Sequence, residues 1–191
     1  MENMDLVLKT ERLVLRPLTV QDVDQVWPYQ SNPELAEYQS YSAHKTKEET
    51  IKWLKQLKDE QELGKNITWG IFMNDQLCGV LSLITILRKH RALTYDRAEL
   101  AYWLGPEFQG KGIMTEAGKR VIKFAFNQFS LHKLIVAHHE GNSGSENLIK
   151  RLGFKFSHEE KEEFMKSDKW VNCLHYELLV SDYLKNSLSN D

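Results

Sequence analysis

Hydrophobic and polar positions follow one another along the chain in an order that predicts a mixed fold of strands and helices. A short apolar run at 13–15 is closed by Pro17, as a first strand would be. Apolar residues then recur at helical spacing over 22–29 and over 46–63, where Thr46-Lys47-Glu48-Glu49 forms a capping box. The first half therefore predicts one strand and two helices.

The remainder of the chain continues with alternating strand-like and helix-like segments. Strands 66–72 and 76–86 flank the polar turn 73–76 and predict a hairpin. A loop is expected at 88–91, a strand at 97–104, an amphipathic helix at 114–129 and a strand at 133–138. A helix at 145–152 and two strands, at about 155–164 and at 169–180, follow. The last residues, 186–191, are expected to fray.

Size and composition bound the class of protein. The chain has 191 residues, of which 41% are hydrophobic and 10% aromatic, enough to form a core and too many for a disordered chain. We expect a single domain over 1–191 with its core at about 8–182, because no linker or repeat interrupts the pattern. Lys and Arg number 25 against 27 Asp and Glu, so no global positive field would hold a nucleic acid, although a local basic groove stays open.

The sequence shows no pattern of a signal peptide or membrane span, and its cysteine usage also favours the cytoplasm. Residues 1–5 carry acids where a signal peptide needs cations, and no run approaches the about 20 apolar residues of a membrane span. Cys78 and Cys173 lie far apart in apolar segments and are interpreted as buried thiols. We therefore expect a cytoplasmic protein that does not bind a membrane.

One segment, 97–117, predicts a binding site for an anion such as a phosphate group. It runs from a strand through a turn containing Gly110 and Gly112 into a helix, which places unpaired backbone N–H groups at the positive end of a helix dipole. The spacing matches neither a Rossmann fingerprint, which would need glycine at Thr115, nor a Walker loop. An ordinary strand-to-helix turn is the competing interpretation.

The same segment resembles a known family. Gln109-Gly110-Lys111-Gly112-Ile113 is similar to the Q/R-x-x-G-x-G/A pyrophosphate loop of the GCN5-related N-acetyltransferases (GNAT), with Met114 in the last position as in the RimJ/RimL-type subgroup. Three further blocks agree in order, namely Thr10 to Arg16, Tyr102 to Pro106 and Asn142 to Phe154.

The resemblance implies an α/β (α+β) fold of GNAT type, with a mixed central sheet of six to seven strands. The sheet would splay between the fourth and fifth strands and be flanked by about four helices. It also implies an acetyl-CoA-dependent N-acetyltransferase whose acceptor is a protein N-terminal α-amino group. A small amine such as a polyamine or antibiotic, a noncatalytic acyl-CoA-binding module and a homodimer remain open.

The resemblance also assigns residues to acetyl-CoA. The backbone at the end of the strand would bind the pantetheine arm, through Tyr102, Trp103 and Leu104. The glycine loop would bind the pyrophosphate, through Gln109, Gly110, Lys111, Gly112, Ile113, Met114 and Thr115. Two residues further along the chain, Asn142 and Ser145, would complete the cofactor site.

Two residues are candidates for the chemistry itself. Glu99 would accept the amine proton, directly or through water, and its competing interpretation is a solvated glutamate or one paired with Arg97. Ser145 would donate to the leaving thiolate, although it equally suits a helix N-cap. His138 and His139 are alternative bases.

The sequence predicts neither a metal site nor a cysteine that would carry the acetyl group. The Cys, His and Asp spacings resemble no zinc pattern, so no metal site is predicted. Neither cysteine has a neighbouring sequence that would favour an acetylated thiol. The acidic run 158–163 would keep an edge strand soluble or attract a cationic acceptor.

Overall fold

The computed structural model describes residues 4–188 and confirms an α/β fold with a mixed sheet. The hydrogen-bonded strand order is β1-β2-β3-β4-β5-β6-β8-β7. Contacts divide the chain into two compact units, Met1–Ile86 with Ala101–Val121 and Leu87–Leu100 with Ile122–Asp191. Strands β4 (Gln76–His90) and β5 (Leu93–Leu104) and helix α4 (Ile113–Asn127) contribute residues to both units.

The first unit combines antiparallel strands with the N-terminal helices. Its remaining elements are β1 (Leu8–Lys9), β2 (Val14–Pro17), a 3-10 turn η1 (Val20–Asp22), α1 (Val23–Gln30), α2 (Pro33–Ala36), α3 (Lys47–Glu62), β3 (Ile67–Met73) and a second 3-10 turn η2 (Pro106–Phe108). Asn74 and Asp75 both have positive φ values, 51° and 62°, at the turn between β3 and β4. This left-handed pair closes the predicted hairpin, because such turns match the twist of the flanking strands.

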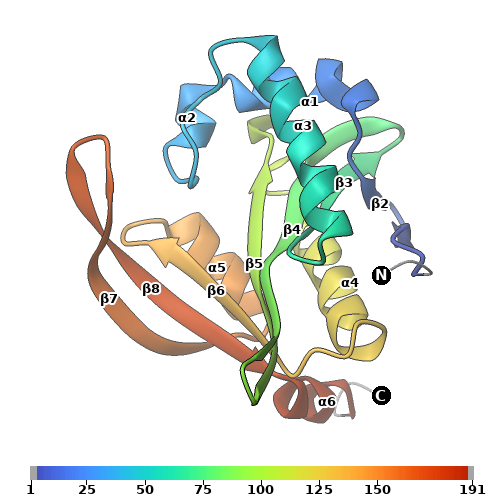
Figure 1. The fold of residues 1–191 in the computed structure, drawn as a ribbon, viewed down its shortest axis with the longest axis vertical. Helices are drawn as coiled ribbons and strands as arrows, with labels where there is room; N and C mark the ends of the chain where they lie inside the picture. The colour runs from blue at the N-terminus through green and yellow to red at the C-terminus, as the bar shows by residue number, and fades with distance from the viewer. Residues whose placement is uncertain (1–3, 189–191) are drawn as a thin grey trace. The chain divides into compact units, whose positions relative to one another are not determined.

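The core of the first unit lies between its helices and its strands. Val26 of α1 and Leu54 of α3 are buried in one cluster with Phe72, Val80 and Trp103 of the strands. Burial of a side chain such as Leu54 stabilises the fold by about 1.5–3 kcal/mol. Helices α1 and α3 therefore pack on the sheet through the apolar stripes that the sequence predicted, and Figure 1 shows both helices beside these strands.

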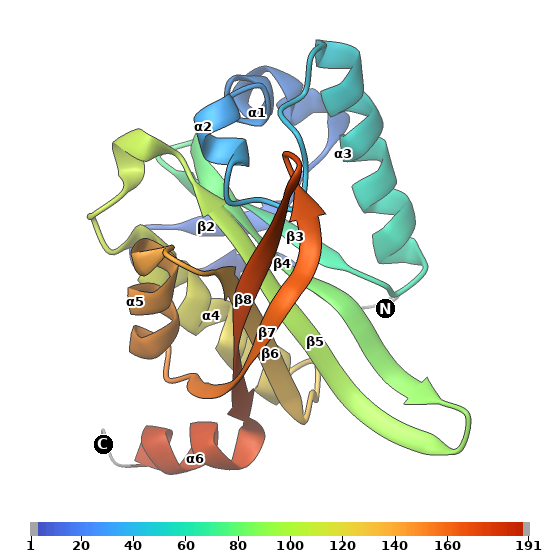
Figure 2. The ribbon, with the colours of Figure 1, turned by 90° about the vertical axis from the view of Figure 1, so that its left-hand side faces the viewer.

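The second unit is built on parallel and antiparallel pairs. Strand β6 (Lys133–His139) pairs in parallel with β5 and antiparallel with β8 (Lys169–Leu179). Strand β7 (Lys155–Lys166) pairs only with β8 in the described sheet order and so forms its edge. Helices α5 (Ser143–Arg151) and α6 (Val180–Leu188) belong to the same unit. Figure 2 shows β7 and β8 as a long twisted hairpin.

The parallel ladder is short. Its registered pairs are Arg97–Lys133, Ala98–Leu134 and Glu99–Ile135. Strand β5 continues to Leu104 and β6 to His139, so each strand extends well beyond these three pairs. The fourth and fifth strands of the prediction correspond to β5 and β6, and the splay expected between them stays a prediction.

Alternation along β6 gives the sheet of the second unit two different faces. Leu134, Val136 and His138 are buried, whereas the intervening residues are half-buried. Directly opposed residues of neighbouring strands share a face. The half-buried face therefore carries Glu99, His139 and His175, and the buried face forms the core.

Several predicted details are wrong. The basic stretch 88–91 is not a loop, because β4 continues to His90 and only Arg91 and Ala92 form the turn. Arg88 explains the extension: its guanidinium lies 4.3 Å from the centroid of the Phe129 ring and 3.2 Å from Asp96 Oδ1. The described residues form a sheet of eight strands where six to seven were expected, and the two-residue β1 is the strand that was not predicted.

The helices also exceed the prediction. The structure describes six α-helices, of which α2 and α6 were not predicted. Residues 186–188, expected to fray, are helical, and 189–191 lie outside the described residues. Within the described part of the chain, no helix is long and apolar enough to span a membrane.

Candidate active site

The glycine turn adopts the backbone conformation that an anion-binding loop requires. Gly110 and Gly112 both have φ of +73°, a region that residues with a Cβ rarely occupy. A Cβ built on Gly110 meets no atom within 4 Å, and one on Gly112 meets only Arg12 Nη2 at 3.8 Å. The two glycines are therefore needed for their backbone angles, and the space beside them is open.

The exposed loop leads into the first turn of α4. Residues Gln109 to Gly112 are exposed, whereas the side chains of Ile113 and Met114 are buried. The amide of Glu116 makes the first helical bond, to the Gly112 carbonyl at 3.0 Å. The preceding amides lie in the first turn, where helices lack internal partners and a negative group is favoured. Burial of Met114 keeps its bulk away from the outer surface of the loop.

An ion pair anchors this helix start to the N-terminal segment. Glu116 Oε1 accepts from Thr10 Oγ1 at 2.5 Å and from the Arg12 amide at 3.2 Å, and Glu116 Oε2 lies 2.7 Å from both Arg12 Nε and Nη2. Arg12 Nη2 also donates to the Lys111 carbonyl at 3.3 Å. Burial raises the pKa of Glu116, but the bonds from Thr10 and Arg12 outweigh it, so that pKa is lowered. Sequence reasoning did not find this contact.

The end of β5 has carbonyl groups that already accept side-chain amides. Gln39 Nε2 donates to the Tyr102 carbonyl at 3.4 Å, and Gln109 Nε2 donates to the Leu104 carbonyl at 3.3 Å. The Trp103 side chain is buried, and its carbonyl oxygen lies 2.4 Å from a Cβ built on Gly79. Glycine at 79 therefore permits the close approach of β4 to this part of β5.

Glu99 lies in the second unit, on its half-buried polar face. Burial raises the pKa of its carboxyl, His175 opposes that change, and Glu163 raises the pKa further. The Arg97 guanidinium, considered above as its partner, lies 5.3 Å from the centroid of the Tyr95 ring. A carboxylate with a raised pKa is a stronger base, as proton abstraction from an ammonium requires.

The two histidine candidates differ in position. His138 is buried on the core face and stacks on Tyr176 at 5.5 Å between ring centroids. His139 is on the same face as Glu99, and burial, Lys166 and His138 lower its pKa although Glu163 opposes this. Alternation along β6 therefore leaves His139 as the histidine with an accessible face.

Asn142, and not Ser145, caps helix α5. Asn142 Oδ1 accepts from the Ser145 amide at 3.1 Å, so the competing interpretation of Ser145 as the helix N-cap is wrong. Ser145 is the third helical residue and is half-buried. Asn142 is the N-cap because its side-chain oxygen reaches the backbone amide of Ser145 in the first turn, where helices lack internal partners.

The site residues fall into both units. The set from Tyr102 to Thr115 belongs to the first unit, and Glu99, Asn142 and Ser145 belong to the second. Both cysteines are free and buried, as predicted. Burial, together with a hydrogen bond to Glu163, raises the pKa of Cys173 to about 12, so its thiolate is strongly disfavoured at neutral pH.

Comparison with known proteins places these features in a family. YdaF of Bacillus subtilis, assigned provisionally as a ribosomal N-acetyltransferase, is 31% identical over 116 residues, which are 61% of this chain and 58% of YdaF. Spermidine N(1)-acetyltransferase of Escherichia coli is 29% identical over 106 residues, 56% of this chain and 54% of that protein. The chain thus spans little more than half the length of these two relatives in the matched segments.

The fold has close structural counterparts. RimL, a ribosomal L7/L12 α-N-protein acetyltransferase solved in complex with coenzyme A, superposes with a TM-score of 0.84 at 19% identity, covering 92% of this chain and 99% of RimL. The acetyltransferase (GNAT) domain family matches residues 12–155, which include the glycine loop and α5. The chain therefore belongs to the GNAT acetyltransferase family.

Proposed function

We propose that this chain is an acetyl-CoA-dependent N-acetyltransferase that acetylates a primary amine, with a protein N-terminal α-amino group as its acceptor. The observation that carries the proposal is the exposed glycine loop, in which Gly110 and Gly112 both have φ of +73°, leading into the first turn of α4. The whole segment 8–182 would act as one acetyltransferase domain. Acetyl-CoA would supply the thioester carbonyl that the amine attacks.

The first unit fits the cofactor by its backbone. Amides from Gln109 to Thr115 would bind the pyrophosphate, and Lys111 would add a nearby positive charge. The side-chain amides of Gln39 and Gln109 donate to the Tyr102 and Leu104 carbonyls, so amide donors of a pantetheine arm suit the same acceptors. Trp103 would contribute its backbone to the same edge.

Glu99 would take the proton from the acceptor ammonium. An α-amino group has a pKa of about 7.7–8.0, close enough to neutral that a carboxylate, acting directly or through water, suffices. Ser145 would donate a hydrogen bond to the cofactor sulfur, and Asn142 would hold the turn that presents it. His139 is the competing base, and parallel Glu99→Gln and His139→Gln variants separate the two.

Relatives support two acceptor classes. YdaF and RimL are named for ribosomal substrates, which favours a protein α-amino group. The spermidine enzyme supports a polyamine, and Glu160 and Glu163 on the β7–β8 hairpin would attract such a cation. The buried free cysteines support action in the reducing cytoplasm.

A free-thiol release assay tests this function. Purified protein with acetyl-CoA is given N-terminal peptides, spermidine or an aminoglycoside, and CoA release is followed over time. We expect a peptide with a free α-amino group to accelerate release and its N-acetylated form to give only the background rate. Faster release with spermidine than with any peptide would identify a small-amine enzyme. No acceleration by any amine would favour a noncatalytic acyl-CoA-binding module.

A further inference from the structure

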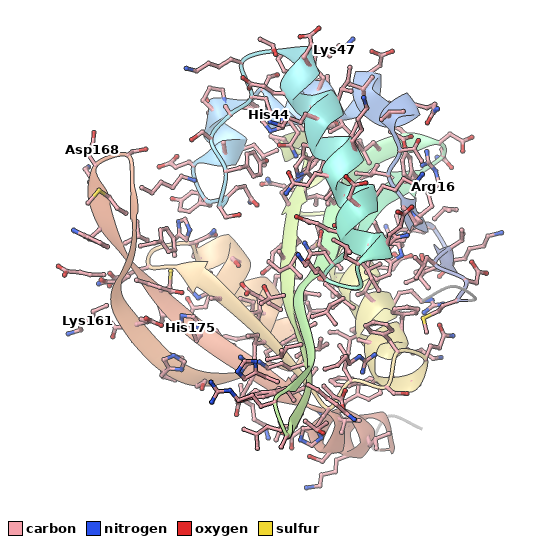
Figure 3. The ribbon with its side chains drawn as sticks, viewed as in Figure 1. Arg16, His44, Lys47, Lys161, Asp168 and His175 are labelled. Carbon is pink, nitrogen blue, oxygen red and sulfur yellow. The ribbon has the colours of Figure 1, made fainter. Side chains whose placement is uncertain are left out.

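Three potential metal ligands meet on the β7–β8 hairpin. His158 and Glu160 of β7 and His175 of β8 each offer one ligand atom, and these atoms lie within 4.8 Å of one another. His158 and His175 are direct cross-strand partners, and Glu160 is two residues further along β7, on the same face. Figure 3 labels His175 on this hairpin. The cluster therefore follows from strand register, which spacing along the chain does not show.

The distances around His175 suit a metal ion. Its Nε2 atom lies 2.9 Å from Glu163 Oε2 and 3.9 Å from Glu160 Oε2. Bonds of about 2.0–2.1 Å to a tetrahedral zinc ion separate two ligand atoms by about 3.3 Å. The two observed distances lie on either side of that separation. Small side-chain rotations would therefore allow His175 Nε2, Glu160 Oε2 and Glu163 Oε2 to bind one ion.

A bulge brings Glu163 to the cluster. The register between β7 and β8 shifts between Glu160 and Phe164, and Glu162 has a positive φ of 52°. Such a bulge changes the direction of the following side chain. Glu163 thereby reaches His175, and its side chain is only 28% exposed.

The imidazole rings of the cluster are held close together. The rings of His158 and His175 stack with centroids 4.6 Å apart and an interplanar angle of 9°. His158 Nδ1 lies 3.2 Å from Ser157 Oγ, and metal-binding histidines commonly use their second nitrogen for such a contact. The arrangement offers two nitrogen and two oxygen donors, with Glu163 as a fourth ligand or a partner of His175.

We propose that His158, Glu160 and His175, assisted by Glu163, bind a divalent transition metal ion, with Zn²⁺ as the ion of choice. Mixed imidazole and carboxylate donors suit Zn²⁺, whereas Mg²⁺ and Ca²⁺ prefer oxygen ligands alone. The cluster belongs to the second unit and shares Glu160 and Glu163 with the carboxylates that would attract a cationic acceptor. Its metal binding is therefore tested without acetyl-CoA or an acceptor amine.

Calorimetric titration of the full chain, without a polyhistidine tag, with ZnCl₂ tests the site. We expect one equivalent of Zn²⁺ to bind, and no detectable heat with MgCl₂ or CaCl₂. Co²⁺ as a spectroscopic probe should give the visible absorption of a four-coordinate ion. Absence of saturable Zn²⁺ binding would overturn the proposal.

Paired variants locate the ion. His158→Ala and Glu160→Gln should each weaken Zn²⁺ binding by at least about tenfold, since even residues behind metal ligands contribute that much. The matched controls are His132→Ala and Glu159→Gln, which change an exposed histidine and an exposed glutamate outside the cluster. Equal loss in the controls, or full binding in His158→Ala, would contradict the assignment. Circular dichroism checks that each variant is folded.

Discussion

Removing the Arg12 guanidinium and the Glu116 charge, singly and together, measures how firmly the glycine loop is anchored. Arg12→Met keeps the length of the side chain and its backbone amide, and Glu116→Gln keeps the shape of the carboxylate. The double variant closes a thermodynamic cycle, whose coupling energy isolates the side-chain pair. The bond from Thr10 to Glu116 remains in Arg12→Met and does not enter the coupling.

The structure sets the size of this coupling. Two Arg12 nitrogens lie 2.7 Å from Glu116 Oε2, and hydrogen bonds to charged groups contribute about 1.5–3 kcal/mol when shielded from water. The Arg12 side chain is 46% exposed and that of Glu116 22%, so solvent screening reduces the value. We expect a coupling of about 1 kcal/mol, the upper end for exposed pairs. For a chain of this size, that corresponds to about 2–4 °C in melting temperature.

Urea denaturation at pH 7 and at pH 3.5 provides the assay. Because the folded-state pKa of Glu116 is lowered, its contribution to stability is full above the unfolded value of about 4.3 and is lost as pH falls through the folded value. The coupling should therefore shrink at pH 3.5. A coupling near zero at pH 7, or one equally large at both pH values, would refute the reasoning.

Three further variants test individual residues. Glu99→Gln should lower kcat by about 10²–10⁴. It should also raise the melting temperature at pH 8 but not at pH 4. Burial raises the folded-state pKa of Glu99, so the folded protein loses stability as pH rises through that pKa and the carboxyl ionises, and glutamine avoids this loss. An equal stability change at both pH values would contradict this. Asn142→Ala should cost about 1 kcal/mol in urea denaturation because α5 loses its cap, and an unchanged midpoint would contradict the observed cap. Ser145→Ala should reduce kcat by about tenfold with little change in acetyl-CoA affinity, as the loss of one hydrogen bond implies, and unaltered turnover would remove Ser145 from the chemistry.

Local patterns predicted most of the fold. The capping box at Thr46 and the apolar stripe with Leu54 fixed α3 to within a residue, because both signals lie within the helix itself. The paired glycines predicted a loop with left-handed backbone, and both adopt φ +73°. The basic segment at Arg88 was misjudged because its strand is stabilised by contacts with Phe129 and Asp96, which local charge does not reveal.

Long-range contacts account for the parts of the site that the sequence did not show. Arg12 and Glu116 are 104 positions apart, and neither belongs to a spacing that signals a contact. His138 and His139 were equivalent candidates until the register of β6 assigned them to opposite faces. His158 and His175 meet only through pairing of β7 with β8.

Titration of CoA into the unmodified chain, Gly112→Glu and Gly64→Glu tests the central claim that the glycine loop holds the cofactor. Gly64 ends α3 with φ +70°, so its variant adds the same charge and a comparable backbone strain outside the loop. We predict one CoA bound per chain, loss of binding in Gly112→Glu and retained binding in Gly64→Glu. Failure of CoA to bind, or equal binding by Gly112→Glu and the unmodified chain, would contradict the account.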